Sequence, residues 1–412
     1  MIDLFNEILA TLRFNKLRTA LTGFAVSWGI FLLIVLLAVS NGLVNGVTGM
    51  FSQRDKEVMS ITGGWAQKPY KGLKDERSIT LKESDTELLE SRNGNIVAYA
   101  VPELSNDSVV ISTQKDYLTG GYKGVYPQSQ RSDGTTMEEG RYINDNDIEQ
   151  GRRVIVLHRE NANTLFGVGE PAVGKFVRVG DLSFTVVGIY FHEWMRSSII
   201  PYTTAKALAG GSENIRRMQV KAKGLSTVED ANEAENEFRS TLGNVHSFDP
   251  TDDSALWIWN RFRDFATTNT ALSTLTLAVW IIGLLTLLSG IVGVSNIMFV
   301  SVRERTHEIG VRRAIGARPV AILRQIILES VAITTLFGYV GIVLGVIVTQ
   351  LIAHFTLSPG PQGHPPIFKD PSVDLSIALQ VTVVLVITGC LAGLFPALKS
   401  LKIKPVEALR DE

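Results

Sequence analysis

Cysteine is nearly absent from this chain of 412 residues, which has only Cys390. A single cysteine excludes any disulfide within the chain, so a domain outside the cell would fold on its hydrophobic core alone. The formal net charge is only -1, which gives no reason to expect nucleic acid as a partner. The six histidines lack the spacing of metal ligands. No metal site and no catalytic site is predicted.

Charge is missing from four long apolar runs, at residues 21–44, 265–302, 330–355 and 375–398. A helix needs about 20 apolar residues to cross a membrane, and a soluble helical bundle seldom excludes charge over such lengths. The predicted spans are residues 21–44, 276–302, 326–355 and 374–398, with a helical stalk at 255–275. The first run is too long for a cleaved signal peptide. Residues 1–20, in which Phe5, Ile8, Leu9 and Leu12 share a face, predict an amphipathic helix at the membrane interface.

The distribution of Lys and Arg predicts the orientation of these spans. Six arginines lie between the second and third spans, and further cations lie in residues 1–20 and in the tail at 399–412. Short cytoplasmic loops are rich in Lys and Arg, so we expect both termini and the loop at 303–325 in the cytoplasm. Residues 45–270 and the short loop at 356–373 would lie outside. The chain is thus predicted to be a multi-pass protein of the cell (inner) membrane.

Residues 45–270 have the mixed charge and turn spacing of a folded soluble domain. Alternating β-branched residues predict strands, and apolar periodicity predicts helices, which together make an α+β domain. A hairpin is expected to turn at Gly180 and Asp181, and Thr227 is expected to cap a helix. The predicted strands are residues 95–101, 109–112, 153–157, 175–179, 184–189 and 219–222, and the predicted helices are 82–91, 161–166 and 227–242.

A segment from Gly169 to Lys175 has the glycine and lysine spacing of a phosphate-binding loop. The chemistry does not fit, because Phe176 stands where Ser or Thr must bind Mg²⁺, Pro171 interrupts the loop, and a strand rather than a helix is predicted next. We interpret the segment as a turn. No other such loop is present in the sequence, and no cofactor is expected to bind directly.

Small residues four apart occur in the last two spans, at Gly341 and Gly345 and at Gly389 and Gly393. This spacing lets helices approach closely, within one chain or between subunits, although glycine is also common in membrane helices generally. Ionisable side chains are missing from the centres of all four spans, which argues against a polar transport path through the helices.

The arginine-rich loop has two interpretations. Positive charge near a membrane attracts anionic headgroups, which accounts for the arginines. The loop also contains Glu304, Glu308 and regularly spaced apolar residues. The segment starts as a continuation of the second span. A short amphipathic helix that docks in a groove of a cytoplasmic partner accounts for all of these residues.

Several motifs resemble the MacB/FtsX-type ABC transporter permeases, a family of mechanotransmission transporters. The most specific is the segment SNIMFVSVRERTHEIGVRRAIGA at 295–317, followed by FPA at 395–397 and IKPVEALR at 403–410. The segments EGRY at 139–142 and NKLRTALT at 15–22 are similar as well. The resemblance covers nearly the whole chain.

The resemblance implies a dimer of two permease chains, identical or related, above two cytoplasmic ABC ATPase subunits that hold ATP and Mg. It implies a MacB-like periplasmic core with a split porter part at about 50–115 and 215–250 and an inserted subdomain at about 116–214. The implied coupling residues are Glu304, Arg305, Glu308, Ile309, Gly310, Arg312, Arg313, Ala314, Gly316 and Ala317. The implied C-terminal motif contains Pro405, Glu407, Ala408 and Leu409.

The macrolide-exporting members of the family carry a fused ATPase domain, whereas this chain begins at the predicted interfacial helix. We therefore expect a stand-alone permease subunit that has no enzymatic activity of its own. The resemblance leaves open the export or extraction of an antibiotic, peptide, toxin or lipoprotein, with a periplasmic adaptor and an outer-membrane channel as further partners. The alternative is an FtsX-like signal transmitter that regulates an extracytoplasmic hydrolase or sensor.

Overall fold

The computed structural model describes residues 16–52, 54–192, 194–356, 371 and 375–400. By its internal contacts the chain divides into two units. The helical unit contains residues 1–47 and 271–412, and the sheet unit contains residues 48–270. Most of the predicted interfacial helix, nearly all of the short loop at 356–373 and the C-terminal motif lie outside the described residues.

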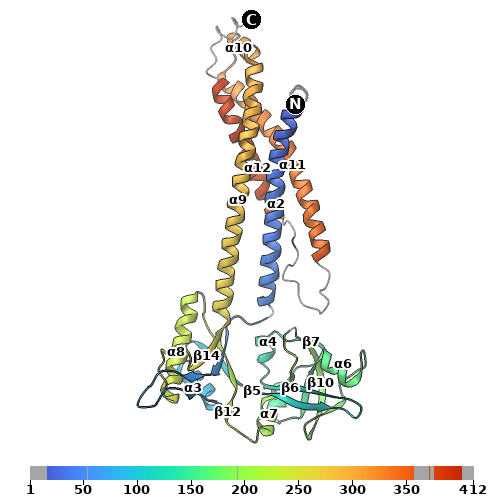
Figure 1. Ribbon diagram of the computed structural model, residues 1–412, viewed down its shortest axis with the longest axis vertical. Helices are drawn as coiled ribbons and strands as arrows, with labels where there is room; N and C mark the ends of the chain where they lie inside the picture. Colours follow the sequence, from blue (N-terminus) through green and yellow to red (C-terminus); the bar gives the residue numbers. More distant parts are fainter. Residues whose placement is uncertain (1–15, 53, 193, 357–370, 372–374, 401–412) are drawn as a thin grey trace. The chain divides into compact units, whose positions relative to one another are not determined.

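Long helices dominate the helical unit, where they run side by side (Figure 1). Within the described residues, four helices are long and apolar enough to span a membrane, at Gly23–Gly49, Arg261–Glu304, Pro319–Phe355 and Ile377–Ser400. This agrees with the four runs without charge. The helices are α2 (Lys16–Ser52), α9 (Arg261–Glu304), α10 (Thr306–Ala314), α11 (Pro319–Thr356) and α12 (Leu375–Ser400).

Serine hydroxyls join the long helices where their backbones come close. Ser27 Oγ of α2 donates to the Phe337 carbonyl of α11 at 2.6 Å. Ser330 Oγ of α11 donates to the Gly389 carbonyl of α12 at 2.9 Å. Because lipid tails are as apolar as leucine, such hydrogen bonds and close packing hold membrane helices together.

The sheet unit contains fourteen strands and six helices among its described residues. The strands are β1 (Val58–Gly63), β2 (Trp65–Ala66), β3 (Arg77–Ser78), β4 (Leu81–Lys82), β5 (Val97–Ser112), β6 (Tyr117–Val125), β7 (Thr136–Gly140), β8 (Val154–His158), β9 (Phe176–Val179), β10 (Leu182–Phe191), β11 (Ser198–Pro201), β12 (Asn214–Ile215), β13 (Arg217–Ala222) and β14 (Leu256–Asn260). The helices are α3 (Ser84–Arg92), α4 (Ser129–Asp133), α5 (Asp145–Glu149), α6 (Arg159–Phe166), α7 (Tyr202–Leu208) and α8 (Val228–His246).

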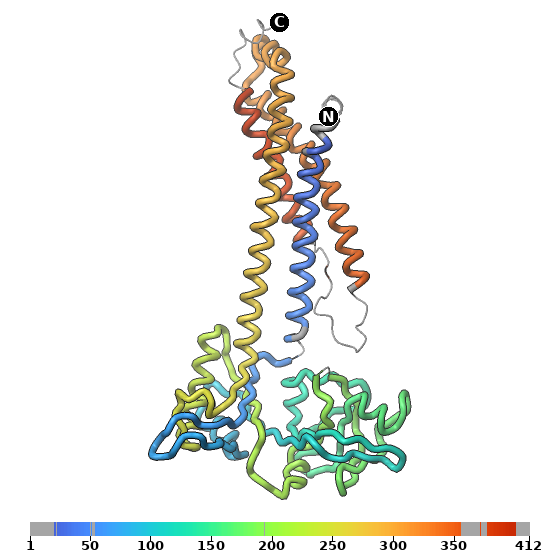
Figure 2. The backbone as a smooth tube through the Cα atoms, in the orientation of Figure 1, coloured from blue at the N-terminus to red at the C-terminus, as the bar shows by residue number. Residues whose placement is uncertain are grey.

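A mixed ten-stranded sheet runs through the sheet unit in the order β14-β1-β13-β5-β6-β11-β8-β10-β7, with β9 beside β10 and β5. Strand β5 joins its two parts, because its first half pairs with β13 and its second half with β6. Figure 2 shows these parts as two groups of strands and helices within residues 48–270. The prediction of separate strands at 95–101 and 109–112 is wrong, because a bulge between Asn106 and Val109 lets one strand continue through the polar residues.

The predicted hairpin and helix cap are present. Val179 pairs with Leu182, so the chain turns at Gly180 and Asp181. The Thr227 side chain accepts a hydrogen bond from the Asp230 backbone N–H at the start of α8, completing a capping box. The predicted helical stalk at 255–275 requires a correction. Residues 256–260 form the edge strand β14, whose alternating burial is typical of a strand, and α9 begins only at Arg261.

The segment that resembles a phosphate-binding loop is a turn followed by strand β9. Gly169 and Gly174 both have the left-handed φ values of turn glycines, 78° and 86°. A phosphate-binding loop must lead into a helix N-terminus, and here a strand follows. The geometry therefore agrees with the interpretation of this segment as a structural turn.

Candidate functional site

The predicted coupling residues lie at the junction of α9, α10 and α11. Helix α9 ends at Glu304, and Arg305, with φ of -98° and ψ of 17°, precedes a separate helix α10. The segment therefore starts as a continuation of the second span, as expected, through Glu304, and a separate short helix follows after Arg305. Gly316 has φ of 96°, and its backbone N–H donates to the Arg313 carbonyl. A glycine in this region ends a helix without the steric cost of a Cβ.

One side of α10 is packed against the helical unit. Ile309 and Gly310 are the buried residues of this helix. Ile309 belongs to a buried cluster that also contains Val302 of α9 and Ile322 and Ile326 of α11. Burial of this side fixes the orientation of α10, since rotating the helix would expose Ile309 to solvent.

A polar network joins α10 to the start of α11. Arg312 Nη1 donates to Gln325 Oε1 at 2.9 Å, and Gln325 Nε2 donates to Glu329 Oε1 at 3.5 Å. Arg305 Nη1 lies 3.3 Å from the same Glu329 oxygen. Glu329 is only 6% exposed, so removal of Arg305 would take a cation away from a buried carboxylate. The network surrounds a small cavity of about 30 Å³ lined by these residues and by Glu308.

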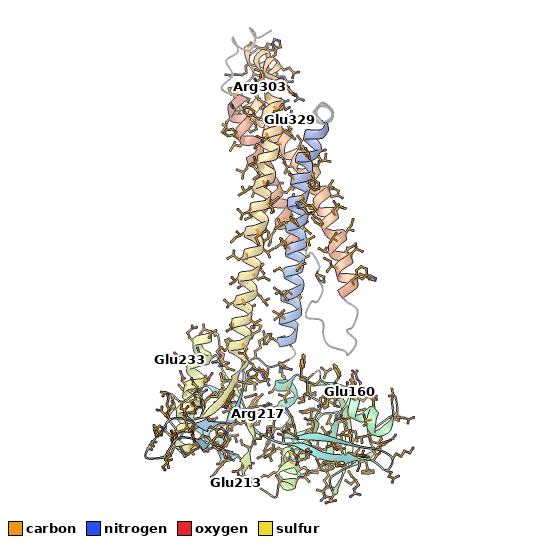
Figure 3. All side chains as sticks on the ribbon, in the orientation of Figure 1. Glu160, Glu213, Arg217, Glu233, Arg303 and Glu329 are labelled. Atoms are coloured by element: carbon orange, nitrogen blue, oxygen red, sulfur yellow. The ribbon has the colours of Figure 1, made fainter. Side chains whose placement is uncertain are left out.

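The exposed residues at the end of α9, along α10 and in the turn that follows form what we call the coupling surface. Charged and apolar side chains are mixed on it, and the apolar ones are prominent: Ile315 is 82% exposed and Val320 is 73% exposed. Figure 3 shows Arg303 and Glu329 at this end of the helical unit. The coupling surface comprises Arg303, Glu304, His307, Glu308, Arg312, Ala314, Ile315, Gly316, Arg318 and Val320, all of which are exposed.

The structure sorts the ten predicted coupling residues by their exposure. Glu304, Glu308, Arg312, Ala314 and Gly316 are exposed, and Arg305, Arg313 and Ala317 are half-buried. Ile309 and Gly310 are buried within the chain, so their side of α10 faces α9 and α11 and would not contact a partner directly. Their place in a coupling site would be to position the helix.

The sequence pattern did not single out Gln325, Glu329 or Val320. The signal was nevertheless present, because Gln325 and Glu329 are four residues apart and therefore share one face of a helix. A lone carboxylate at the start of an apolar helix predicts a cationic partner.

The four predicted packing glycines lie at close contacts between helices of the chain. A Cβ on Gly341 would come within 2.4 Å of the Ser27 carbonyl oxygen, and one on Gly345 within 2.8 Å of Ile34 Cγ2, both on α2. A Cβ on Gly389 would lie 3.0 Å from Val331 Cα, and one on Gly393 2.7 Å from Ser330 Cβ, both on α11. These glycines thus allow contacts of α11 with α2 and of α12 with α11.

Taken together, the four apolar helices, the large α/β unit and the short amphipathic helix with its exposed basic face define a multi-pass membrane protein. Residues 19–239 match the family described as MacB-like periplasmic core domain, and residues 280–405 match the family described as FtsX-like permease C-terminal. The chain belongs to the MacB/FtsX-type ABC permease family.

Curated relatives agree with this membership. The macrolide export ATP-binding/permease protein MacB of Wolinella succinogenes is 28% identical over 437 residues, covering 100% of this chain and 62% of the relative. MacB of Bartonella henselae is 30% identical over 419 residues, covering 99% and 59%. The pyoverdine export ATP-binding/permease protein PvdT of Pseudomonas entomophila is 28% identical over 430 residues, covering 100% and 60%. The chain spans less than two thirds of the length of each relative.

Solved structures similar to this chain include the periplasmic region of MacB from Actinobacillus actinomycetemcomitans. It is 20% identical with a TM-score of 0.43, and the match covers 53% of this chain and 95% of that one. The extracellular domain of the noncanonic ABC-type transporter YknZ from Gram-positive bacteria is 17% identical with a TM-score of 0.41, covering 49% and 100%.

Proposed function

We propose that this chain is the permease subunit of an ABC complex in which a separate cytoplasmic ATPase moves the sheet unit and drives export or extraction of a substrate on the far side of the membrane. ATP and Mg would bind to the ATPase, which would dock on the coupling surface. Two permease chains would form the working assembly. The relatives named as macrolide and pyoverdine exporters support an export role.

The observation that carries this proposal is the continuity of α9. Helix α9 runs without interruption from Arg261 to Glu304, which at about 1.5 Å per residue makes it a rod on the order of 65 Å long. Strand β14 of the large sheet ends at Asn260, one residue before it. A displacement at residue 304 would therefore reach the sheet through a single helix.

The rigid attachment of α10 supports the same proposal. A partner that pushes on Glu308 or Arg312 acts on a helix held by Ile309 and by the Arg312–Gln325–Glu329 network. Such a helix transmits force to α9 and α11, whereas a loosely held loop would absorb it. The described residues at the centres of the spans include no Asp, Glu, Lys, Arg or His, which suits movement of a substrate outside the membrane rather than through it.

The decisive experiment purifies the full chain with its ATPase and measures substrate-stimulated ATP hydrolysis. We expect the double variant Glu308→Ala and Arg312→Ala to lose this stimulation while still inserting into membranes. The matched control is Glu233→Ala with Arg178→Ala, which removes two exposed charges of the sheet unit. Stimulation that survives in the first variant, or is lost equally in the control, would reject the assignment of the coupling surface.

The proposed orientation is tested by cysteine labelling. Cys390→Ala gives a chain without cysteine, into which single cysteines are introduced by Tyr117→Cys and Ile315→Cys, both at exposed positions. A membrane-impermeant maleimide added to intact cells should label position 117 and leave position 315 unlabelled. Labelling of both positions from the same side would contradict the orientation.

Recovery of a hydrolase rather than an adaptor with the purified chain would favour the signalling alternative.

A further inference from the structure

Two tryptophans lie on one face of the edge strand β14. Residues Trp257 and Trp259 alternate with buried neighbours, in the order buried, exposed, buried, exposed, buried. In the register with β1, Trp257 pairs with Thr62 and Trp259 with Ser60. Because side chains alternate between the faces of a sheet, both indoles share the face of Thr62 and Ser60 and not that of Ile61.

Arg217 of β13 lies on the same face, because β13 pairs with the other side of β1. In the register of β1 and β13, Ile61 pairs with Met218, which places Arg217 beside Thr62 in the row that contains Trp257. The other face of these strands is filled by the hydrophobic core. The face that carries the indoles instead borders an open hollow of about 490 Å³. The residues that line this hollow are Ser60, Thr62, Arg217, Trp257, Ile258 and Trp259. This volume is within the ~300–1,000 Å³ of typical small-molecule sites.

Both indole rings are held in place although they are exposed. Trp257 is 70% and Trp259 is 49% exposed. Trp259 Nε1 donates to Asp264 Oδ2 at 2.7 Å, and the Arg261 guanidinium lies 5.2 Å from its ring centre. The Trp257 ring lies so close to Gly64 that a Cβ there would come within 2.7 Å of Trp257 Cδ1. Ordered, exposed aromatic surface is the usual anchor of a binding site.

The charge of Arg217 is only partly compensated. Its Nη1 lies 3.9 Å from Glu103 Oε1, which is beyond hydrogen-bond distance. The same Glu103 carboxylate is shared with Lys123 at 3.5 Å and with Gln219 Nε2 at 3.4 Å. The guanidinium therefore retains N–H donors that can bind an anion. Figure 3 marks Arg217 within the sheet unit.

A second polar group points to the same place. Ser60 lines the hollow, is 3% exposed, and its hydroxyl has no hydrogen-bond partner among the described residues. Buried hydroxyls in folded proteins are usually paired. An unpaired hydroxyl on the floor of the hollow is a further group that an occupant could satisfy.

We propose that this hollow binds a small, planar, apolar molecule with one anionic group, such as an aromatic carboxylate or sulfonate. Its flat body would stack on Trp257 and Trp259, and its anion would accept hydrogen bonds from Arg217. A cation is disfavoured by the guanidinium of Arg217, whose charge is only partly compensated. The site lies entirely in the sheet unit and does not depend on ATPase coupling.

The test is calorimetry of the full chain in amphipol with two probes, 1-naphthalenesulfonate and the neutral 1-naphthalenemethanol, with empty amphipol subtracted. We expect Trp257→Leu to weaken both probes by about tenfold, since stacking is lost. Arg217→Met should weaken the sulfonate by about tenfold and leave the neutral probe unchanged, because charge-assisted bonds are the stronger ones. The matched controls Trp194→Leu and Arg216→Met, at exposed positions of the same unit, should change neither.

Three outcomes would overturn the proposal. The first is the absence of saturable binding of the sulfonate by the unaltered chain. The second is equal weakening by the Trp194 or Arg216 controls, which would mean that the probe binds nonspecifically. The third is a Trp257→Leu variant that becomes monomeric in light scattering while it binds the sulfonate as before, because the hollow would then be a contact between two copies of this chain. Circular dichroism checks that each variant is folded.

Discussion

The helical unit and the sheet unit use apolar side chains in opposite ways. In the sheet unit large aromatic residues such as Phe184, Phe238 and Phe248 are fully buried. In the helical unit, leucines such as Leu277 and Leu285 of α9 are 60% exposed, and many others of α9, α11 and α12 resemble them. Exposure of an apolar side chain therefore has a different meaning in each unit. In the helical unit it indicates contact with lipid or another helix, whereas in the sheet unit it is an ordinary surface feature unless such side chains gather in one place.

The two units also differ in how they pair the polar groups that are shielded from water. The sheet unit buries ions in pairs within its fold, for example Arg239 with Glu235 at 3.1 Å, whereas the helical unit has such a pair near the end of its spans, Arg305 with Glu329 at 3.3 Å. The long helices are joined by serine hydroxyls that donate to backbone carbonyls, and their described charged residues gather at the ends. A membrane interior has no water to hydrate a charge, so helix contacts there use small uncharged groups.

The largest difference between the two units is expected when a charge replaces an exposed apolar side chain in each of them. Leu288→Asp on α9, at a position 52% exposed, should make insertion of this span less favourable by about 3 kcal/mol, because an aspartate is costly at the centre of a membrane helix. Val168→Asp in the sheet unit, at a position 88% exposed, should change stability by less than about 0.5 kcal/mol. A microsomal insertion assay measures the first and thermal unfolding the second. Equal tolerance at both positions would contradict the comparison.

A somewhat smaller effect is expected when a larger side chain replaces a glycine at a contact between two helices. Gly341→Val would place its Cβ within 2.4 Å of the Ser27 carbonyl oxygen, and overpacking of this kind costs about 1–3 kcal/mol. The control is Gly49→Val, because a Cβ at Gly49 meets nothing within 4 Å. The thermal midpoint of the purified chain in detergent separates the two variants. A midpoint that falls as far for Gly49→Val would mean that helix propensity, and not packing, is responsible.

In the sheet unit, loss of a single cap should have a modest effect. Thr227→Ala removes the acceptor for the Asp230 backbone N–H, which lies 3.1 Å from Thr227 Oγ1, and should destabilise the unit by about 1 kcal/mol. Thr119→Ala, at an exposed strand position, serves as the control. Chemical denaturation gives both values. An unchanged midpoint for Thr227→Ala would mean that solvent replaces the capping bond.

The smallest expected effect is the pH dependence of the sheet unit. Burial lowers the pKa of His158 and of His192, and the Arg54 guanidinium lowers the pKa of His192 further. His192 Nδ1 accepts hydrogen bonds from the backbone N–H groups of Trp194 and Met195, and protonation would remove this acceptor. A histidine whose pKa is lowered by folding stabilises the fold above its unfolded pKa of about 6.5 and loses this contribution as the pH falls.

The thermal midpoint of the sheet unit should therefore fall between pH 7.5 and pH 5. The double variant His158→Gln and His192→Gln should flatten this dependence, although its stability at pH 7.5 will be lower. A midpoint that rises toward pH 5, or a variant that keeps the full slope, would contradict the assignment of the pH dependence to these two histidines.

Local patterns predicted the parts of the fold that local chemistry controls. The spans followed from runs without charge, the hairpin at Gly180 from its turn chemistry, and the start of α8 from Thr227. The pattern missed β6 and β7. It also missed β1 and β11, which have no exposed residue and so no alternation, and β14, whose exposed positions are tryptophans. It also divided β5, because a bulge compensates for the polar residues 106–108 only when β6 lies beside it.

The coupling site was likewise predicted only in part. The resemblance singled out the residues of α10, but not which of them face inward, since this depends on the packing of Ile309 against α11. The spacing of Gln325 and Glu329 indicated a shared helix face, but the structure was needed to identify Arg305, 3.3 Å away, as a partner of Glu329. Arg217 and the two tryptophans come from strands about 40 residues apart in the chain, and only sheet pairing makes them neighbours.

The sequence by itself determined the membrane spans, their cationic ends and the family, because apolar length and charge act through the immediate solvent of each residue. The tertiary structure decided which side of α10 is exposed, how β5 connects the two parts of the sheet, and where the hollow beside Trp257 lies. Those features depend on contacts between distant segments, whose free energy exists only after the chain has folded.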